Sequence, residues 1–207
     1  MKLNPLERVF VRSPMRRAMQ ALVVHWFRAV MPLPPGSDIL EIGCGAGAGA
    51  RMVTRQFKPR RLFLTDLDPL MIRLAQETVD QNTTTPARFC ICDAARLPFH
   101  GDSIDALFGF GFLHHVPAWR DGLREVHRVL KPGGVYYMEE YYPSLYQNII
   151  TRRLTVHPAH DRFNSNDLRK EFANVKLDLR TTFELKRFGI LGVGVKKTGS
   201  RIEAQLP

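Results

Sequence analysis

The stretch ILEIGCGAGAGAR, residues 39–51, constrains the fold of this chain more than any other feature. Apolar, strand-forming residues lead directly into a loop in which glycine alternates with cysteine and alanine. Glycine tolerates positive φ and close approach of the backbone, but it loses more conformational entropy on folding than any other residue. In open α/β sheets, such a loop joins a strand to a helix N-terminus at the edge where ligands bind. The stretch therefore predicts an α/β fold whose loop backbone touches a ligand.

Strand and helix patterns alternate after this loop. Strands joined by helices of ten or more residues connect through right-handed crossovers, so the alternation predicts a parallel sheet. The sequence KPGG, residues 131–134, reads as a stop and turn before the fifth strand. The expected strands are 38–42, 61–66, 87–92, 104–110 and 135–141, and the expected helices are 46–56, 69–81 and about 119–130.

Two helix starts are predicted near the N-terminus, at Asn4-Pro5 and Ser13-Pro14, because each pairs an N-cap residue with proline at the first helical position. After the second start, apolar residues recur at helical spacing and predict one buried face. Arginines 16, 17 and 28 fall largely off that face. The apolar positions are Met15, Met19, Leu22, Trp26 and Val30.

The C-terminal part has a different pattern. A short helix at 167–173 precedes two strands at 175–183 and 189–197, which predicts an antiparallel hairpin on the sheet edge. Gly192 and Gly194 share one strand face, so we expect another element to pack closely there.

Composition bounds the class of protein. The chain has 207 residues, 44% of them hydrophobic, and no apolar run near the roughly 18 that a membrane span needs. No signal-peptide pattern is visible, so a cytoplasmic location is expected. Cys44, Cys90 and Cys92 form no even framework; buried thiols in a reducing compartment are favoured over a metal pair. The net charge of +10 admits nucleic acid or an anionic membrane surface, but the basic residues are dispersed.

Acidic residues follow or precede the expected strand ends. Glu41 stands two residues before the glycine loop, where a carboxylate favours a cationic ligand over a pyrophosphate. Asp66 ends the second strand and suits a ribose, whereas Asp68 precedes Pro69 and suits a helix cap. Asp93 ends the third strand; it can accept an adenine amino group or cap the next turn.

The loop itself satisfies both G-x-G-x-G and the dinucleotide pattern G-x-G-x-x-A, so a nicotinamide oxidoreductase remains an alternative. Three carboxylates around it suit a nucleoside that carries positive charge. S-adenosylmethionine, with ribose, adenine, ammonium and sulfonium, is the ligand that this chemistry favours.

The segments ILEIGCGAG, LTDLDPLM, CDAARLPF, SIDALFGFGFLHHV and LREVHRVLKPGG occur in this order. Together they resemble the class I S-adenosylmethionine-dependent methyltransferases, in the branch of ubiquinone/menaquinone-biosynthesis C-methyltransferases and small-molecule methyltransferases. The resemblance covers residues 39 to about 140. It implies a Rossmann-like, seven-stranded sheet of order 3-2-1-4-5-7-6, with strand 7 antiparallel and helices on both faces.

The resemblance also implies site residues. Glu41 and the backbone of the glycine loop would hold the methionine part of the donor. Asp66 would hold the ribose, Leu67 and the Ala94 amide would face the adenine, and Asp93 would accept its amino group. The Phe110 backbone would accept from the ammonium. The loop positions are Gly43, Cys44, Gly45 and Gly47.

No motif identifies the acceptor. The Asn-Pro-Pro-Tyr-type signature of enzymes that methylate amino groups of nucleic acids is absent, and so is the Pro-Cys nucleophile for cytosine C5. His114 and His115 follow the fourth strand and either act as a general base or cap and pack the loop. Residues 139–163 are expected to form a lid, with Trp26 and Phe27 on the opposite wall. Its candidate acceptor-side residues are Tyr141, Tyr142, Tyr146 and Arg162, beside His157 and His160.

We therefore expect a single methyltransferase domain that acts on a small or lipid-like molecule and holds no metal. RNA or protein is the alternative acceptor, motivated by the basic charge. Within the domain, the expected parts are N-terminal helices (1–35), a donor-binding core (36–141), an acceptor-side insertion with a helix (142–173), the hairpin (174–197) and a tail (198–207).

Overall fold

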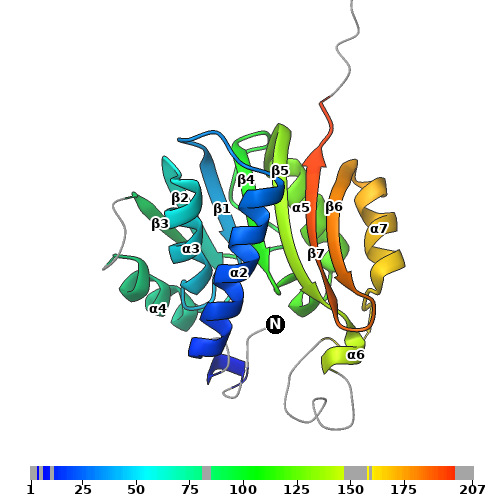
Figure 1. Ribbon diagram of the computed structural model, residues 1–207, viewed down its shortest axis with the longest axis horizontal. Coiled ribbons are helices and arrows are strands. Elements are labelled where there is room, and N and C mark those ends of the chain that lie inside the picture. The colour runs from blue at the N-terminus through cyan, green and yellow to red at the C-terminus, as the bar shows by residue number, and fades with distance from the viewer. Residues whose placement is uncertain are drawn as a thin grey trace, which may run out of the picture.

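A computed structural model describes residues 4, 7–9, 12–80, 85–146, 158 and 160–198 of the chain. Its seven-stranded sheet has the order β3-β2-β1-β4-β5-β7-β6 (Figure 1). Strands β1 to β5 pair in parallel, and β7 runs antiparallel to both β5 and β6. The predicted strand order and the antiparallel terminal hairpin are confirmed.

Most element bounds agree with the sequence patterns to within two residues. The strands are β1 (Asp38–Ile42), β2 (Arg61–Asp66), β3 (Ala87–Ile91), β4 (Ile104–Phe110), β5 (Leu130–Tyr141), β6 (Leu177–Leu185) and β7 (Gly189–Lys196). The helices are α2 (Pro14–Val30), α3 (Ala48–Phe57), α4 (Pro69–Asp80), α5 (Trp119–Val129), α6 (Pro143–Tyr146) and α7 (Ser165–Asn174), with a 3₁₀ turn η1 (Leu113–His115).

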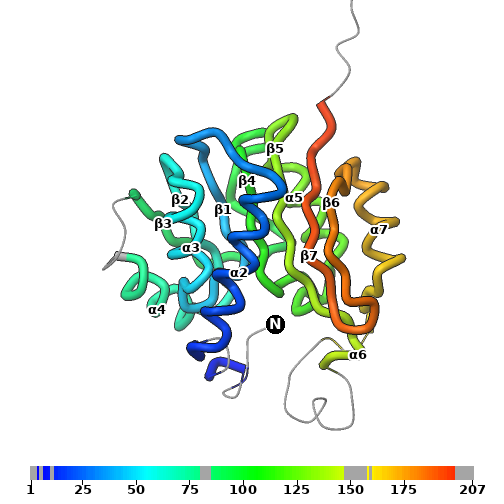
Figure 2. The backbone as a smooth tube through the Cα atoms, in the orientation of Figure 1, coloured from blue at the N-terminus to red at the C-terminus, as the bar shows by residue number. Residues whose placement is uncertain are grey.

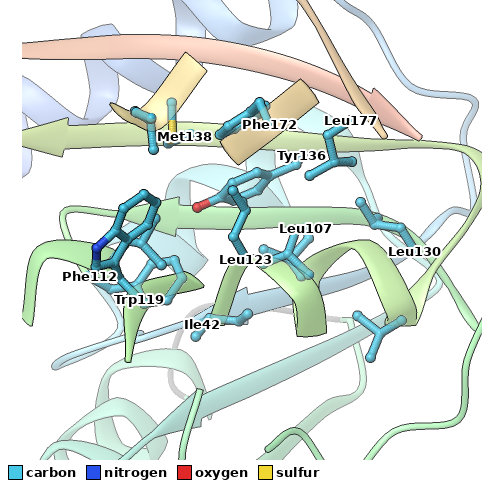
Figure 3. Close-up of a cluster of buried hydrophobic side chains, with 14 of the residues drawn as sticks. Ile42, Leu107, Phe112, Trp119, Leu123, Leu130, Tyr136, Met138, Phe172 and Leu177 are labelled. Atoms are coloured by element: carbon cyan, nitrogen blue, oxygen red, sulfur yellow. The ribbon is translucent and has the colours of Figure 1, made fainter. Parts of the chain in front are cut away.

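Helices cover both faces of the sheet, and each face has its own buried cluster. Alternate residues of β1 face opposite clusters: Ile39 packs with α2, α3 and α4, whereas Leu40 packs with α5 and α7. In the second cluster, Leu123 of α5 and Phe172 of α7 flank Tyr136 of β5 (Figure 3). Because its side chains alternate between two covered faces, β1 is buried along its whole length.

The predicted buried face of α2 is wrong in its first half. Met15 is 60% exposed and Leu22 is 72% exposed, whereas Arg16 and Gln20 are buried. The helix start is as predicted, because Ser13 Oγ accepts a hydrogen bond from the Arg16 backbone and proline follows the cap. Arg16 points inward and pairs with the buried carboxylate of Glu139 on β5. The spacing of apolar residues gives no sign of such an ion pair.

The turn predicted at KPGG, residues 131–134, is wrong, because these residues lie inside β5. Leu130 already pairs with Ile104, and the next paired residues are Ala106 and Val135. The four intervening residues form an irregularity in the strand, at which Gly133 takes a φ of 79°. A bulge satisfies the same glycine and proline preferences as a turn, so the sequence pattern does not distinguish them.

The terminal hairpin packs closely against α7, as the glycine pattern predicted. A Cβ atom at Gly194 would lie 2.7 Å from a ring carbon of Phe172. At the other end of the hairpin, the β6–β7 turn lies beside α6 (Figure 2). There the Tyr142 backbone donates a 2.9 Å hydrogen bond to the Phe188 carbonyl.

Candidate functional site

A cavity of about 630 Å³ opens at the carboxyl edge of the parallel strands. The loops after β1, β2, β3 and β4 line it, together with the first turns of α2 and the segment from the end of β5 to α6. It brings together most of the residues predicted for the site: Gly43, Cys44, Gly45, Asp66, Leu67, Asp93, Ala94, Phe110, His114, His115, Tyr141 and Tyr146.

The glycine loop owes its shape to left-handed backbone and to tight packing. Gly43, Gly45 and Gly47 have φ values of 65°, 52° and 81°. A Cβ atom at Gly43 would lie 2.6 Å from the Cβ atom of Phe112, so a side chain there would collide as well as strain the backbone. Gly47 is the N-cap of α3 and does not line the cavity. The loop thus exposes its backbone at positions 43–45, where a ligand can approach.

Glu41 lies behind the loop rather than in the cavity lining. It is 1% exposed, and its buried Oε2 atom has no hydrogen-bond partner in the structure. Burial raises the pKa of Glu41 well above its ordinary value, the charge of Arg16 opposes the shift, and the charge of Asp66 adds to it. A buried acceptor without a donor fits a cationic ligand group, which is the chemistry of the S-adenosylmethionine ammonium or sulfonium.

Asp66 and Asp68 make different contacts, and the helix cap predicted for Asp68 is present. One oxygen of Asp66 accepts the Gly45 N–H at 3.0 Å, and the other accepts the Asp68 N–H at 2.9 Å. Burial raises the pKa of Asp66, and these backbone hydrogen bonds oppose the shift. Asp68 accepts the Leu70 N–H at the start of α4 and pairs with Arg8 at 2.8 Å. Asp66 therefore anchors the glycine loop and faces the cavity at once.

Asp93 has the capping role that the sequence offered and also lines the cavity. Its Oδ1 atom accepts the Ala95 N–H at 2.9 Å and so caps the turn, while the residue also lines the cavity. At the end of β4, the Phe110 carbonyl accepts a long 3.5 Å hydrogen bond from Arg16. A ligand ammonium at this carbonyl would share it with Arg16, which the sequence did not indicate.

The two histidines lie on η1 and line the cavity. His114 is buried, and its Nδ1 atom lies 2.7 Å from Oε2 of Glu140. Its ring lies 4.3 Å from that of His115 and stacks on Tyr146 at 5.4 Å. The structure thus gives His114 a carboxylate partner.

An ion-paired network that sequence reasoning missed joins α2 to β5. Arg16 donates two hydrogen bonds to Glu139, at 2.9 and 2.7 Å, and both residues are 4% exposed. The Tyr141 hydroxyl donates to the same carboxylate at 2.8 Å. Burial works against it, but the bonds to Glu139 raise the pKa of Arg16 above its ordinary value. The available signal was the pair of adjacent acids, residues 139 and 140, at the end of a strand that is otherwise buried.

Two predicted acceptor-side residues lie away from the cavity. Tyr142 is 3% exposed, packs in the core and bonds to Glu184 at 2.9 Å. Arg162 donates to the Pro158 carbonyl and is not part of the lining. His157 lies outside the described residues. Alternation along the strand explains Tyr142, because it points opposite to Tyr141.

The opposite wall is formed by α2, as predicted, but by different residues. Phe27 is fully buried against Phe108 and Tyr137, and neither it nor Trp26 lines the cavity. The first turns of the helix take that place: Met15, Arg16, Met19 and Gln20.

Two other predictions bear on the described residues alone. Within them, no group of histidine, cysteine and acidic side chains is placed to hold a metal ion. Among the same residues, no helix is long and apolar enough to cross a membrane.

Comparison with known proteins points to one class. Residues 39–134 match the family model described as a methyltransferase domain. The chain is 34% identical over 112 residues to the ubiquinone/menaquinone biosynthesis C-methyltransferase UbiE of Cupriavidus necator, a match that covers 52% of this chain and 44% of the relative. It is 30% identical over 117 residues to the sterol 24-C-methyltransferase erg6 of Schizosaccharomyces pombe, covering 56% and 31%. The chain thus spans less than half the length of these two relatives.

A solved structure extends the likeness over nearly the whole chain. The complex of the Haloferax volcanii Trm112 methyltransferase activator with a methyltransferase contains a chain that matches with a TM-score of 0.77 and 20% identity, over 92% of this chain and 94% of that one. The predicted resemblance is confirmed: this is a class I S-adenosylmethionine-dependent methyltransferase fold, and S-adenosylmethionine is the cofactor that the class implies.

Proposed function

We propose that this chain transfers a methyl group from S-adenosylmethionine to a small-molecule or lipid-like acceptor. The observation that carries the proposal is the cavity, which the glycine loop and Asp66 line together with aromatic residues of β5 and α6. Methyl transfer from a sulfonium requires mainly that the acceptor be aligned with the methyl group in a water-poor pocket. One cavity lined by both groups of residues suits both reactants.

The glycine loop, the residue behind it and the residues at the end of β2 and after β3 would hold the donor. Glu41 and the backbone at 43–45 would hold the methionine part, Asp66 the ribose, and Asp93 with Ala94 the adenine. The bound donor supplies an electrophilic methyl group. Tyr141 and Tyr146 would then face the acceptor, and His114 and His115 would be the candidate bases.

RNA or protein is the second candidate acceptor, and the net charge of +10 favours it. The cavity supports the small molecule instead, because its volume of about 630 Å³ is in the range of small-molecule sites. Incubating the protein with labelled donor and separated metabolite, lipid, RNA and protein fractions of a cell extract distinguishes them. Label in the metabolite or lipid fraction is the expected result, and label confined to RNA or protein would reverse the assignment.

Replacing Asp66 with alanine should weaken donor binding by about 1.5–3 kcal/mol, because it removes a charge-assisted hydrogen bond to the ribose. Calorimetry with S-adenosylhomocysteine measures the change, and NADH serves as the ligand that should not bind. Wild-type affinity in the variant would transfer the ribose role to Asp68. Tight binding of NADH without either donor form would reject the methyltransferase assignment.

Replacing Glu41 with glutamine should stabilise the ligand-free protein at neutral pH and weaken donor binding about 10- to 100-fold. Since burial raises the pKa of Glu41, the folded state holds its proton more tightly than the unfolded chain. Wild-type stability therefore declines as pH rises from the ordinary glutamate pKa towards the raised one, and the variant lacks this decline. Thermal unfolding at several pH values, with and without S-adenosylhomocysteine, measures both effects. Lower stability of the ligand-free variant would show that Glu41 has a partner inside the protein.

A further inference from the structure

Glu140 is a fully buried carboxylate that lies behind the turn carrying both histidines. Its Oε1 atom accepts backbone N–H groups of Leu113 at 2.8 Å and Phe112 at 3.2 Å. Its Oε2 atom accepts the His114 backbone N–H at 3.3 Å and lies 2.7 Å from Nδ1 of the same residue. The carboxylate thus holds both the backbone of η1 and the imidazole ring.

These contacts determine which ring nitrogen carries the proton. A carboxylate surrounded by N–H donors acts only as an acceptor, so Nδ1 of His114 must donate to it. In the neutral ring, Nε2 then carries the lone pair. His115, Tyr141 and Tyr146 pack against the ring at 4.3, 5.5 and 5.4 Å between centroids and fix its plane. His114 lines the cavity, and Nε2 is the ring nitrogen on the side away from the Glu140 carboxylate.

We propose that Glu140 is a positioning residue that holds His114 in the Nδ1–H form, so that Nε2 acts as the general base towards the acceptor. The inference rests on the proposed methyl transfer. It also narrows the acceptor to one that loses a proton on methylation, such as a hydroxyl group, an N–H group or an acidic carbon. An acceptor that reacts only through a permanent lone pair, such as a thioether, makes no use of this pair.

The step balances with these groups alone. A lone pair of the acceptor atom forms the bond to the methyl carbon, and the carbon–sulfur bond breaks with its electrons passing to sulfur. The acceptor's proton passes to Nε2 of His114. The resulting imidazolium stays next to the Glu140 carboxylate, which stabilises its positive charge.

The variant Glu140→Gln separates this role from a purely structural one. The glutamine oxygen can still accept the backbone N–H groups of residues 112 and 113, so η1 keeps two of its three backbone hydrogen bonds to this side chain. Its amide nitrogen, facing Nδ1, would donate instead of accept and would move the imidazole proton to Nε2. The lone pair of the neutral ring would then lie on Nδ1, which faces residue 140 rather than the acceptor.

The first test needs no acceptor. Long-range ¹H–¹⁵N spectra of protein labelled in its histidines, with S-adenosylhomocysteine added, report which nitrogen of each ring is protonated, and the His114→Gln spectrum assigns the signal. Wild-type protein should show His114 protonated on Nδ1, and Glu140→Gln should show it protonated on Nε2. A wild-type ring protonated on Nε2 would overturn the proposal.

The second test uses labelled donor with the extract fraction that wild-type protein methylates. Glu140→Gln should reduce kcat about 10- to 100-fold and alter the pH profile, while the dissociation constant of S-adenosylhomocysteine stays unchanged. Among the residues that the structure describes, Glu140, Tyr141, His115 and Tyr146 are titratable groups that contact His114. The matched control is Glu184→Gln, which breaks an ion pair to Arg169 away from the cavity.

The possible failures are distinguishable. Wild-type kcat and pH profile in Glu140→Gln, with donor binding and turnover intact, would overturn the inference and leave the methyltransferase assignment standing. Absence of donor binding, or of any labelled product, in the wild type would overturn the proposed function itself. Equal losses in Glu140→Gln and Glu184→Gln would assign Glu140 to stability only.

Discussion

Replacing Arg16 with alanine is expected to destabilise the protein by about 3–5 kcal/mol, because it leaves Glu139 as a buried charge without its partner. The pair is bidentate, and both residues are 4% exposed, so solvent cannot take over the lost interaction. Urea unfolding followed by circular dichroism measures the loss. The same substitution should loosen the first turns of α2, which form one wall of the cavity.

The control for this prediction lies on the same helix. Arg17 is exposed, and its replacement by alanine should change the free energy of unfolding by no more than about 0.5 kcal/mol. The combined replacement of Arg16 by methionine and Glu139 by leucine should recover much of the loss, because neither charge of this pair then remains buried. If Arg16→Ala unfolds like Arg17→Ala, the carboxylate must find another partner.

Replacing His114 with glutamine is expected to lower turnover by about 10²–10⁴, the usual contribution of a general base. Glutamine can still bond to Glu140, so folding and the affinity for S-adenosylhomocysteine should stay near wild type. The assay is methyl incorporation from labelled donor, after donor binding has been verified by calorimetry. In wild-type protein, the rate should fall in acid because a protonated imidazole cannot accept a proton.

The neighbouring histidine supplies the comparison. If His114 alone is the base, His115→Gln should retain most of the turnover, although its ring packs against His114 at 4.3 Å. A larger loss in His115→Gln than in His114→Gln would exchange their roles. A wild-type rate that does not vary between about pH 6 and 9 would argue against both residues as bases.

Local patterns were sufficient for the succession of strands and helices, whereas the strand order in the sheet and the expected donor residues came from the resemblance to known methyltransferases. Period-two apolar runs, helix caps and the glycine loop are properties of neighbouring residues, so β1, β2 and β4 have the bounds that were expected. Asp66 and Asp68 could be told apart because proline follows only the second. The resemblance also rests on short segments of neighbouring residues, so it could give an expected role to each donor residue.

Only the tertiary structure showed which charged residues meet at the end of β5. Arg16 and Glu139 are separated by 123 positions, and Glu140 lies 26 positions from His114, so no periodicity connects them. Their pairing depends on which face each element turns inward after packing. The same reason exposes Met15 and moves Tyr142 out of the cavity. The sequence by itself determined the strands, the helices and the glycine loop through local backbone preferences, whereas the charged contacts at the end of β5 required the packed fold.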